Sequence, residues 1–148
     1  MATDFQLHER LAADCVAVTA GPLSQLLLMK DANYPWLVLV PQRPGLRDFH
    51  DLDPADLPAA TREIVAASRI LEDSLRPDKI NVAALGNQVP QLHVHVIARF
   101  HDDPAWPNPI WGVLPPEDYA PDALAARGAA FRAARGGPTR SRTRPSRG

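Results

Sequence analysis

The sequence predicts an α+β domain in which a five-stranded antiparallel sheet carries a long helix on one face. Five short runs rich in apolar and β-branched residues are joined by few residues, which favours antiparallel pairing over helical crossovers. One longer segment repeats apolar residues at steps of three and four, as an amphipathic helix does. With 148 residues, 45% of them hydrophobic, the chain is long enough to form one domain around its own core.

The first half of the chain is predicted to hold one short helix and three strands. The helix covers residues 5–13, with Thr3 or Asp4 as its cap. Glycine and proline interrupt the next thirty residues, and the runs between them predict strands over 15–19, 24–29 and 36–40.

The long helix comes after a connector over residues 42–51. Either Asp53 or Asp56 can cap it, and Pro77 ends it. We expect its apolar stripe to lie on the sheet; the stripe consists of Leu57, Ala60, Ile64, Ala67, Leu71 and Leu75. Two further strands, over 79–85 and 91–98, are close in sequence and predict a hairpin.

After Arg99 the sequence becomes rich in proline and tryptophan, so residues 100–121 are not expected to form regular structure. Trp106 and Trp111 either cover the core of this domain or contact a partner subunit, and we favour the partner. A terminal helix over 121–135 is predicted to be anchored by Leu124 and Phe131.

The charges divide the chain into a folded domain over 1–135 and a basic tail over 136–148. The tail carries four arginines and no acid, so the net charge of −1 becomes −5 when these four are left out. Its Gly, Pro, Ser and Thr content predicts a disordered end. Four arginines without an aromatic residue are a weak nucleic-acid signal, and we expect no nucleic-acid partner.

The cysteine content and the hydropathy indicate a cytoplasmic protein without a membrane partner. No stretch approaches the roughly 18 apolar residues of a membrane span, and the first ten residues do not resemble a signal peptide. The only cysteine, Cys15, cannot form a disulfide within the chain, which fits a reducing compartment. We expect its thiol to be a small buried hydrophobe rather than a nucleophile.

The strand over 91–98 carries the chemistry. Its even positions are apolar, whereas Gln91, His93 and His95 share the other face, with side chains about 7 Å apart at alternate positions. Polar groups are costly to bury unpaired, so this face should meet water, a ligand or a metal. The paired histidines have three interpretations: local hydrogen bonding, two ligands of a metal site, or covalent and acid–base chemistry.

These residues resemble the signature of the histidine triad (HIT) family, His-x-His-x-His followed by two apolar residues. Here the segment reads Gln91-Leu92-His93-Val94-His95-Val96-Ile97, with glutamine in place of the first histidine. The turn over 86–89 resembles the phosphate-contacting turn of the family, and the run ending at Pro41 resembles its proline-closed strand. The likeness spans about residues 10 to 100 and implies a HIT-like fold, a homodimer and a bound nucleotide.

The resemblance also implies roles for particular residues. His93 would attack the α-phosphate and form a nucleotidyl-histidine, and His95 would contact the same phosphate. The backbone carbonyl of Gln91 would accept the Nδ1 proton of His93, while its side-chain amide would orient the leaving group. Asn87 and Gln88 would donate to phosphate oxygens.

Two further residues are candidates for binding the substrate. Asp31 lies where relatives bind the ribose hydroxyls, although a turn aspartate often caps its own loop. Asn81 is expected near the same end of the strands, with packing in the sheet as the alternative.

The leading hypothesis is a nucleotide hydrolase or nucleotidyl transferase that needs no metal or other cofactor. Its substrate would be a dinucleoside polyphosphate, a nucleoside phosphoramidate or a similar conjugate. Because Gln91 cannot shuttle a proton, the alternative is a non-catalytic nucleotide-binding protein. A third hypothesis is a metal-dependent β-protein built on the His-x-His pair.

Overall fold

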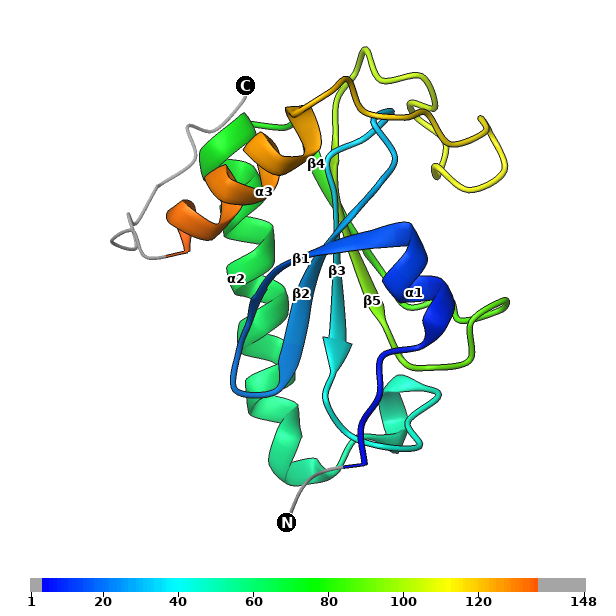
Figure 1. Cartoon of the computed structure of the whole chain (residues 1–148), viewed down its shortest axis with the longest axis vertical. Coiled ribbons are helices and arrows are strands. Elements are labelled where there is room, and N and C mark those ends of the chain that lie inside the picture. The colour runs from blue at the N-terminus through cyan, green and yellow to red at the C-terminus, as the bar shows by residue number, and fades with distance from the viewer. Residues whose placement is uncertain (1–3, 136–148) are drawn as a thin grey trace, which may run out of the picture.

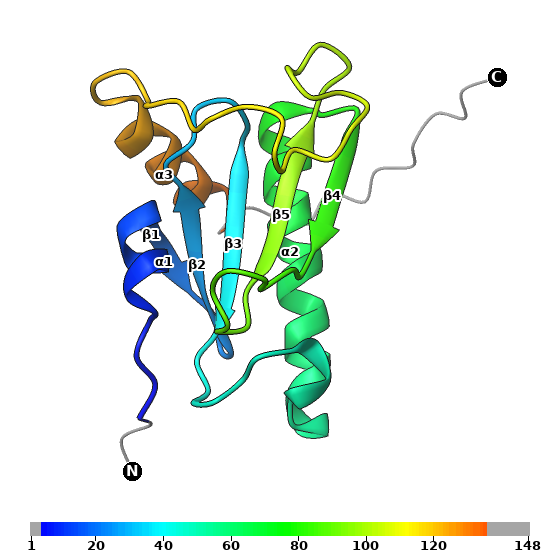
Figure 2. The same cartoon turned by 90° about the vertical axis from the view of Figure 1, so that its right-hand side faces the viewer.

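One antiparallel sheet organises the molecule. The structure is a computed structural model that describes residues 4–135, so the predicted tail over 136–148 lies outside the described residues. The strands lie in the order β1-β2-β3-β5-β4, and every neighbouring pair is antiparallel, which confirms the predicted sheet (Figure 2). Their bounds are β1 (Cys15–Ala20), β2 (Ser24–Met29), β3 (Trp36–Pro41), β4 (Lys79–Ala83) and β5 (Val94–Arg99).

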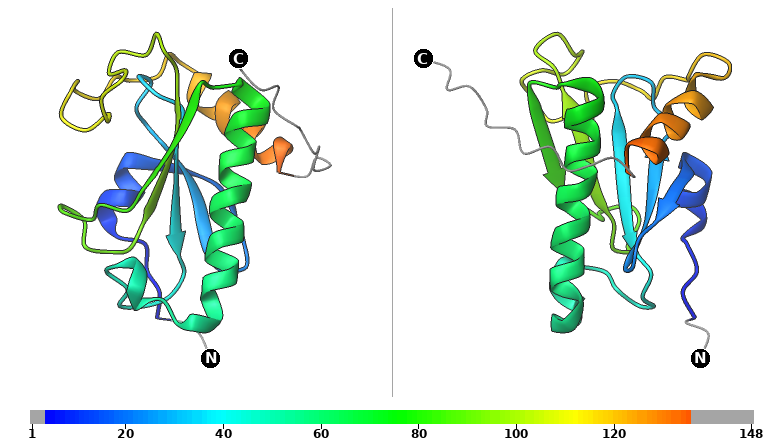
Figure 3. Two further views of the ribbon diagram at one scale, coloured as in Figure 1. Left: turned by 180° about the vertical axis from the view of Figure 1, so that it is seen from behind. Right: turned by 90° about the vertical axis from the view of Figure 1, so that its left-hand side faces the viewer.

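The helices cover the two faces of the sheet unequally. The long helix α2 (Leu57–Leu75) and the terminal helix α3 (Ala123–Ala134) lie together on one face (Figure 3). The short helix α1 (Glu9–Asp14) lies on the other face, beside loops that come after β4 and β5 (Figure 1). Among residues 4–135, no helix is long and apolar enough to cross a membrane.

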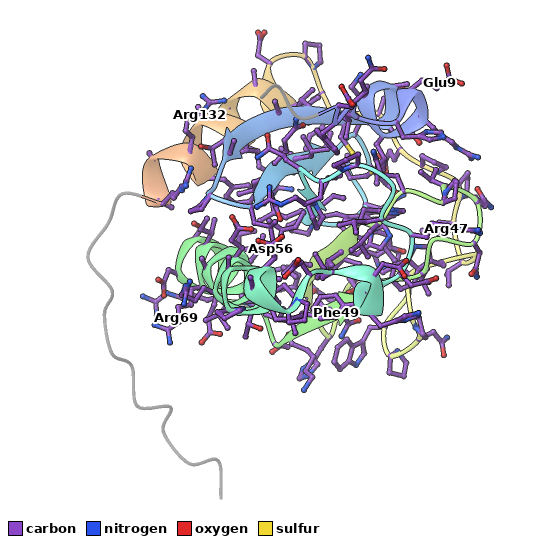
Figure 4. The ribbon with its side chains drawn as sticks, turned by 90° about the horizontal axis from the view of Figure 1, so that it is seen from below. Glu9, Arg47, Phe49, Asp56, Arg69 and Arg132 are labelled. Carbon is purple, nitrogen blue, oxygen red and sulfur yellow. The ribbon has the colours of Figure 1, made fainter. Side chains whose placement is uncertain are left out.

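Of the two candidate caps, only Asp53 makes a side-chain cap hydrogen bond, because the carboxylate of Asp56 accepts from Arg43 instead. Two 3-10 turns, η1 (Phe49–Asp51) and η2 (Pro54–Asp56), precede it. The carboxylate of Asp53 accepts from the N–H of Ala55 and caps η2, and α2 begins directly after Asp56. Figure 4 looks along the molecule from this end, with Asp56 at the start of the helix and Arg69 on the side away from the sheet.

The predicted apolar stripe of α2 packs on the sheet from its second turn onward. Ala60, Ala67 and Leu71 are buried, whereas Leu57 is 38% exposed because the first turn extends beyond the ends of the strands (Figure 2). The helix ends where Arg76 adopts a left-handed conformation, immediately before Pro77. The prediction was therefore right for the helix and its face, and wrong for Leu57.

The alternation along β5 separates two cores. Val94, Val96 and Ala98 belong to the core under α2 and α3, where Phe131 is also buried. Ile97 belongs to the core on the α1 face. Cys15 is buried in this second core, and burial, followed by the charge of Asp14, raises the pKa of its thiol to about 12. The thiol therefore behaves as the expected small hydrophobe.

Several predicted boundaries were wrong, and the terminal helix begins at Ala123 rather than at residue 121. The first helix begins at Glu9 rather than at residue 5, because the backbone of residues 6–8 binds the side chain of Gln91 instead. The fourth strand stops at Ala83. The fifth strand begins at Val94 rather than at residue 91, because the N–H of Leu92 donates to a carbonyl outside the sheet.

Candidate active site

A cleft of about 700 Å³ opens on the α1 face of the sheet. Its floor is formed by Trp36 of β3, by His95 of β5 and by His93 immediately before β5. Its sides are formed by α1, the turn after β2, the loop over 85–89 and residues from the segment 111–118. Figure 1 shows these segments gathered on the side of the sheet away from α2. Two of the three residues on the predicted polar face, His93 and His95, therefore meet a cleft.

His93 lies one residue before β5 and is oriented by a short hydrogen bond. Its Nδ1 is 2.7 Å from the backbone carbonyl oxygen of Gln91. A carbonyl only accepts, so the proton of the ring must be on Nδ1, and the neutral ring carries a free lone pair on Nε2. This is the hydrogen bond that the resemblance implied, and it leaves the Nε2 lone pair free to form a bond.

His95 is oriented in the opposite sense. The indole Nε1–H of Trp36 donates to its Nδ1 at 2.9 Å, within the protein interior. Because an indole only donates, Nδ1 must be unprotonated, and the neutral ring carries its proton on Nε2. Burial, followed by the charge of His93, lowers the pKa of His95 to about 4, so the ring is neutral near pH 7.

The two imidazoles therefore offer complementary groups at one place. Their ring centroids are 4.8 Å apart and the rings are nearly perpendicular, at 77°. One ring has an unprotonated Nε2, and the other has an Nε2–H. A nucleophile beside a neutral hydrogen-bond donor suits attack on phosphorus, because the donor can hold an oxygen whose charge grows in the transition state.

The loop after β4 faces the same cleft. Gly86, Asn87 and Gln88 all line it, as predicted for a phosphate-contacting turn. Gly86 adopts a φ of +69°, a conformation that a residue with a Cβ rarely takes. This turn brings the two amide side chains to the cleft that holds the histidines.

Asp31 both lines the cleft and caps its own turn. It is 6% exposed, and its Oδ1 accepts from the N–H of Asn33 at 2.9 Å and of Glu117 at 3.2 Å. One oxygen of the carboxylate is thus occupied by structural hydrogen bonds. Both interpretations of Asp31 remain compatible with its position.

Two predicted site residues have side chains that are used elsewhere. The Gln91 amide accepts from the N–H of His8 and donates to the carbonyl of Gln6, both at 2.8 Å, and Gln91 does not line the cleft. Asn81 lies on the edge strand, where its Oδ1 accepts from buried Arg99 at 2.8 Å. The side chain of Gln91 thus holds the N-terminal segment and that of Asn81 holds Arg99, while a contact of either with the substrate stays a prediction.

Two tryptophans complete the site, and sequence reasoning did not assign them there. Trp36 donates to His95, and Trp111 packs edge-on against both of them, with ring centroids 6.2 and 5.3 Å away. Trp111 thus contributes to the cleft of its own chain, while Trp106 packs over Arg99. Contact of either ring with a partner subunit stays a prediction. Sequence reasoning lacked the pairing register of β3 with β5. This register places Trp36 opposite Ile97 and so brings its indole to His95.

The described residues do not gather the ligands of a metal site. Among residues 4–135, no three His, Cys, Asp or Glu side chains lie close enough together to hold an ion. The absence of a cofactor requirement stays a prediction.

Comparison with known families identifies the domain. The family model of the HIT domain matches residues 10–102, which includes the cleft residues from α1 to β5. This chain belongs to the HIT family. No curated protein is similar enough to count as a match.

Solved structures of histidine triad proteins agree with this HIT domain over most of its length. One from Bradyrhizobium japonicum is 46% identical, covers 87% of this chain and 96% of its own, and superposes with a TM-score of 0.85. One from Marinobacter aquaeolei VT8 is 43% identical, with 88% and 95% covered and a TM-score of 0.84. One from Sinorhizobium meliloti 1021 is 40% identical, with 86% and 95% covered and a TM-score of 0.83. HIT proteins bind nucleotides, and many are hydrolases or transferases.

Proposed function

We propose that this HIT protein cleaves a nucleotide conjugate at its α-phosphate through a nucleotidyl-histidine on His93. The observation that supports this most directly is the hydrogen bond between Nδ1 of His93 and the Gln91 carbonyl, which leaves Nε2 free at the cleft. The substrate is a dinucleoside polyphosphate, a nucleoside phosphoramidate or a similar conjugate. The product is a nucleoside monophosphate or, with another acceptor, a transferred nucleotidyl group.

The reaction has two displacements. In the first, the Nε2 lone pair of His93 forms a bond to phosphorus, and the bond from phosphorus to the leaving group breaks. The leaving group keeps the bonding electron pair and departs as a phosphate anion or, if it is an amine, takes a proton from solvent. In the second, water attacks the phosphorus, the bond to Nε2 breaks, and the water gives up a proton to solvent. The Nε2–H of His95 and the turn over 86–88 hold phosphate oxygens in both steps.

Intact-mass analysis tests this proposal. After incubation with a panel of dinucleoside polyphosphates and nucleoside phosphoramidates, the protein should gain the mass of one nucleotidyl group. His93→Ala should lose both the adduct and turnover, by roughly a thousandfold or more. His50→Ala is the matched control, because the His50 side chain is 85% exposed and lies outside the cleft. A His93→Ala variant as fast as the wild type would refute the mechanism.

A non-catalytic nucleotide-binding protein is the second candidate, favoured by Gln91. An amide has no transferable proton at neutral pH, and this one is bound to the N-terminal segment. Calorimetry separates the candidates. Nucleotide binding without a slow heat of turnover, for every conjugate in the panel, supports the binding protein and counts against the enzyme.

We further propose that the protein is a homodimer joined along β4. This strand is at the edge of the sheet, so one side of its backbone is unpaired, and Val82 on it is 47% exposed. Val82→Lys should convert the dimer to a monomer in sedimentation experiments. Val65→Lys, at a site on α2 that is 45% exposed, should leave the dimer intact. A monomeric wild type would refute this assembly.

A further inference from the structure

The tautomers of the two active-site histidines have different origins in the fold. The partner of His93 is a backbone carbonyl two residues away, so any side chain at position 91 would supply it. The partner of His95 is a side chain from another strand, because Trp36 opens β3 and His95 lies in β5. Only the second interaction depends on the chemistry of one particular residue.

The indole of Trp36 is held in the position from which its N–H donates to His95. Trp36 is 9% exposed, and its N–H donates along a 2.9 Å hydrogen bond. Trp111 packs edge-on against the indole at an interplanar angle of 89°, and also against the imidazole. Trp111 thus packs against both of the rings that share this hydrogen bond and holds them in place.

A proton on Nδ1 of His95 would break this arrangement. Two N–H groups would then face each other, and the indole would become a buried donor without an acceptor, which is costly. Either the other neutral tautomer or the imidazolium would produce this conflict. A bare Nδ1 is the only state of the ring that satisfies the indole.

We propose that Trp36 is a positioning residue that holds the proton of His95 on Nε2. The histidine pair then presents one unprotonated nitrogen and one N–H donor to the cleft. The low pKa of His95 agrees with this assignment, since burial and the neighbouring His93 also disfavour its charged form. His95 therefore acts as a neutral donor to a phosphate oxygen and not as a proton shuttle. This catalytic consequence rests on the proposed function, whereas the tautomer does not.

Nitrogen NMR of the ¹⁵N-labelled full chain tests the tautomer without any substrate. In the wild type near pH 7, the Nδ1 shift of His95 should be that of an unprotonated nitrogen and the Nε2 shift that of a protonated one. A scalar coupling across the hydrogen bond should join Nδ1 of His95 to the indole nitrogen of Trp36. A protonated Nδ1, a mixture of tautomers or a missing coupling would overturn the proposal.

The Trp36→Phe variant tests the cause, because it keeps an aromatic ring and removes the N–H. The His95 signals should shift to those of a tautomer mixture, and kcat should fall about tenfold with KM changed less than about twofold. Trp111→Phe, which removes no hydrogen bond to His95, should leave the tautomer unchanged. A single unchanged tautomer in Trp36→Phe would overturn the role of Trp36. If no nucleotidyl adduct forms on His93, the proposed enzymatic function is refuted, whereas the NMR result on the tautomer of His95 is unaffected.

Discussion

Arg99 and Asp103 form a buried bidentate ion pair, with an Nε to Oδ2 distance of 2.7 Å and an Nη2 to Oδ1 distance of 3.0 Å. Their side chains are 2% and 6% exposed. The carboxylate also accepts from three backbone N–H groups between residues 100 and 106. The pair thus fixes the segment that leaves β5 and later forms one side of the cleft.

Removal of the carboxylate charge should destabilise the fold. Asp103→Asn keeps the shape but leaves Arg99 buried without its counter-charge, which should lower the free energy of unfolding by about 3–5 kcal/mol. Urea denaturation measures the change. Asp102→Asn, at an exposed neighbouring position, should stay within about 0.5 kcal/mol of the wild type. Equal effects at the two positions would show that the ion pair contributes little.

Acid should weaken the same region. Burial acts to raise the pKa of Asp103, but Arg99 and the backbone donors outweigh it and hold the pKa below its usual value. The stabilisation is therefore complete above the unfolded pKa of about 3.9 and is lost as the pH falls through the lower folded pKa. Below pH 4, denaturation curves should show that the free energy of unfolding of the wild type decreases as the pH falls, and Asp103→Asn should lack this decrease.

His95 should make stability depend on pH in a higher range. Its folded pKa of about 4 lies below the ordinary value of 6.5, so the unfolded chain binds the proton more tightly. Its contribution is present above pH 6.5 and decreases toward pH 4, by about 3 kcal/mol in total. His95→Asn should flatten this slope, whereas His50→Asn, at an exposed site, should not. Parallel slopes for wild type and His95→Asn would contradict the prediction.

The leaving group should control the rate of the proposed reaction. Because Gln91 has no proton to give and its amide is engaged by the N-terminal segment, the leaving group departs without help from this side chain. For aryl esters of a nucleoside monophosphate, kcat/KM should fall steeply as the pKa of the phenol rises. Adduct formation measured by rapid mixing reports the first step alone. If the rate of adduct formation does not change with the pKa of the phenol, another group supplies the proton.

Two glycines should respond in opposite ways to alanine. A Cβ at Gly21 would clash with Oε2 of Glu63, the oxygen that accepts from the N–H groups of Leu23 and Ser24. Gly21→Ala should displace that carboxylate and cost about 1–3 kcal/mol. Gly128→Ala lies inside α3, where the added Cβ meets nothing within 4 Å beyond its chain neighbours and the backbone of its own helix. It should stabilise the fold by up to about 1 kcal/mol. Thermal denaturation compares them.

Local patterns predicted the sheet, the long helix and the histidine cleft, because strand alternation and helical spacing can be recognised from residues that are close together in the sequence. They could not predict that the side chain of Gln91 binds residues 6 and 8, which are 85 and 83 positions away. They also could not place Trp36 on His95, since this contact depends on the pairing of β3 with β5. Both contacts join segments that are remote in sequence.

The double use of Gln91 has a practical consequence for work with this protein. Its carbonyl orients His93, while its amide holds residues 6–8. An affinity tag fused ahead of residue 4 would be attached to the segment that Gln91 anchors, close to His93, the proposed nucleophile. Helix α3 lies on the opposite face of the sheet (Figure 3). Kinetic measurements should therefore use protein from which an amino-terminal tag has been removed.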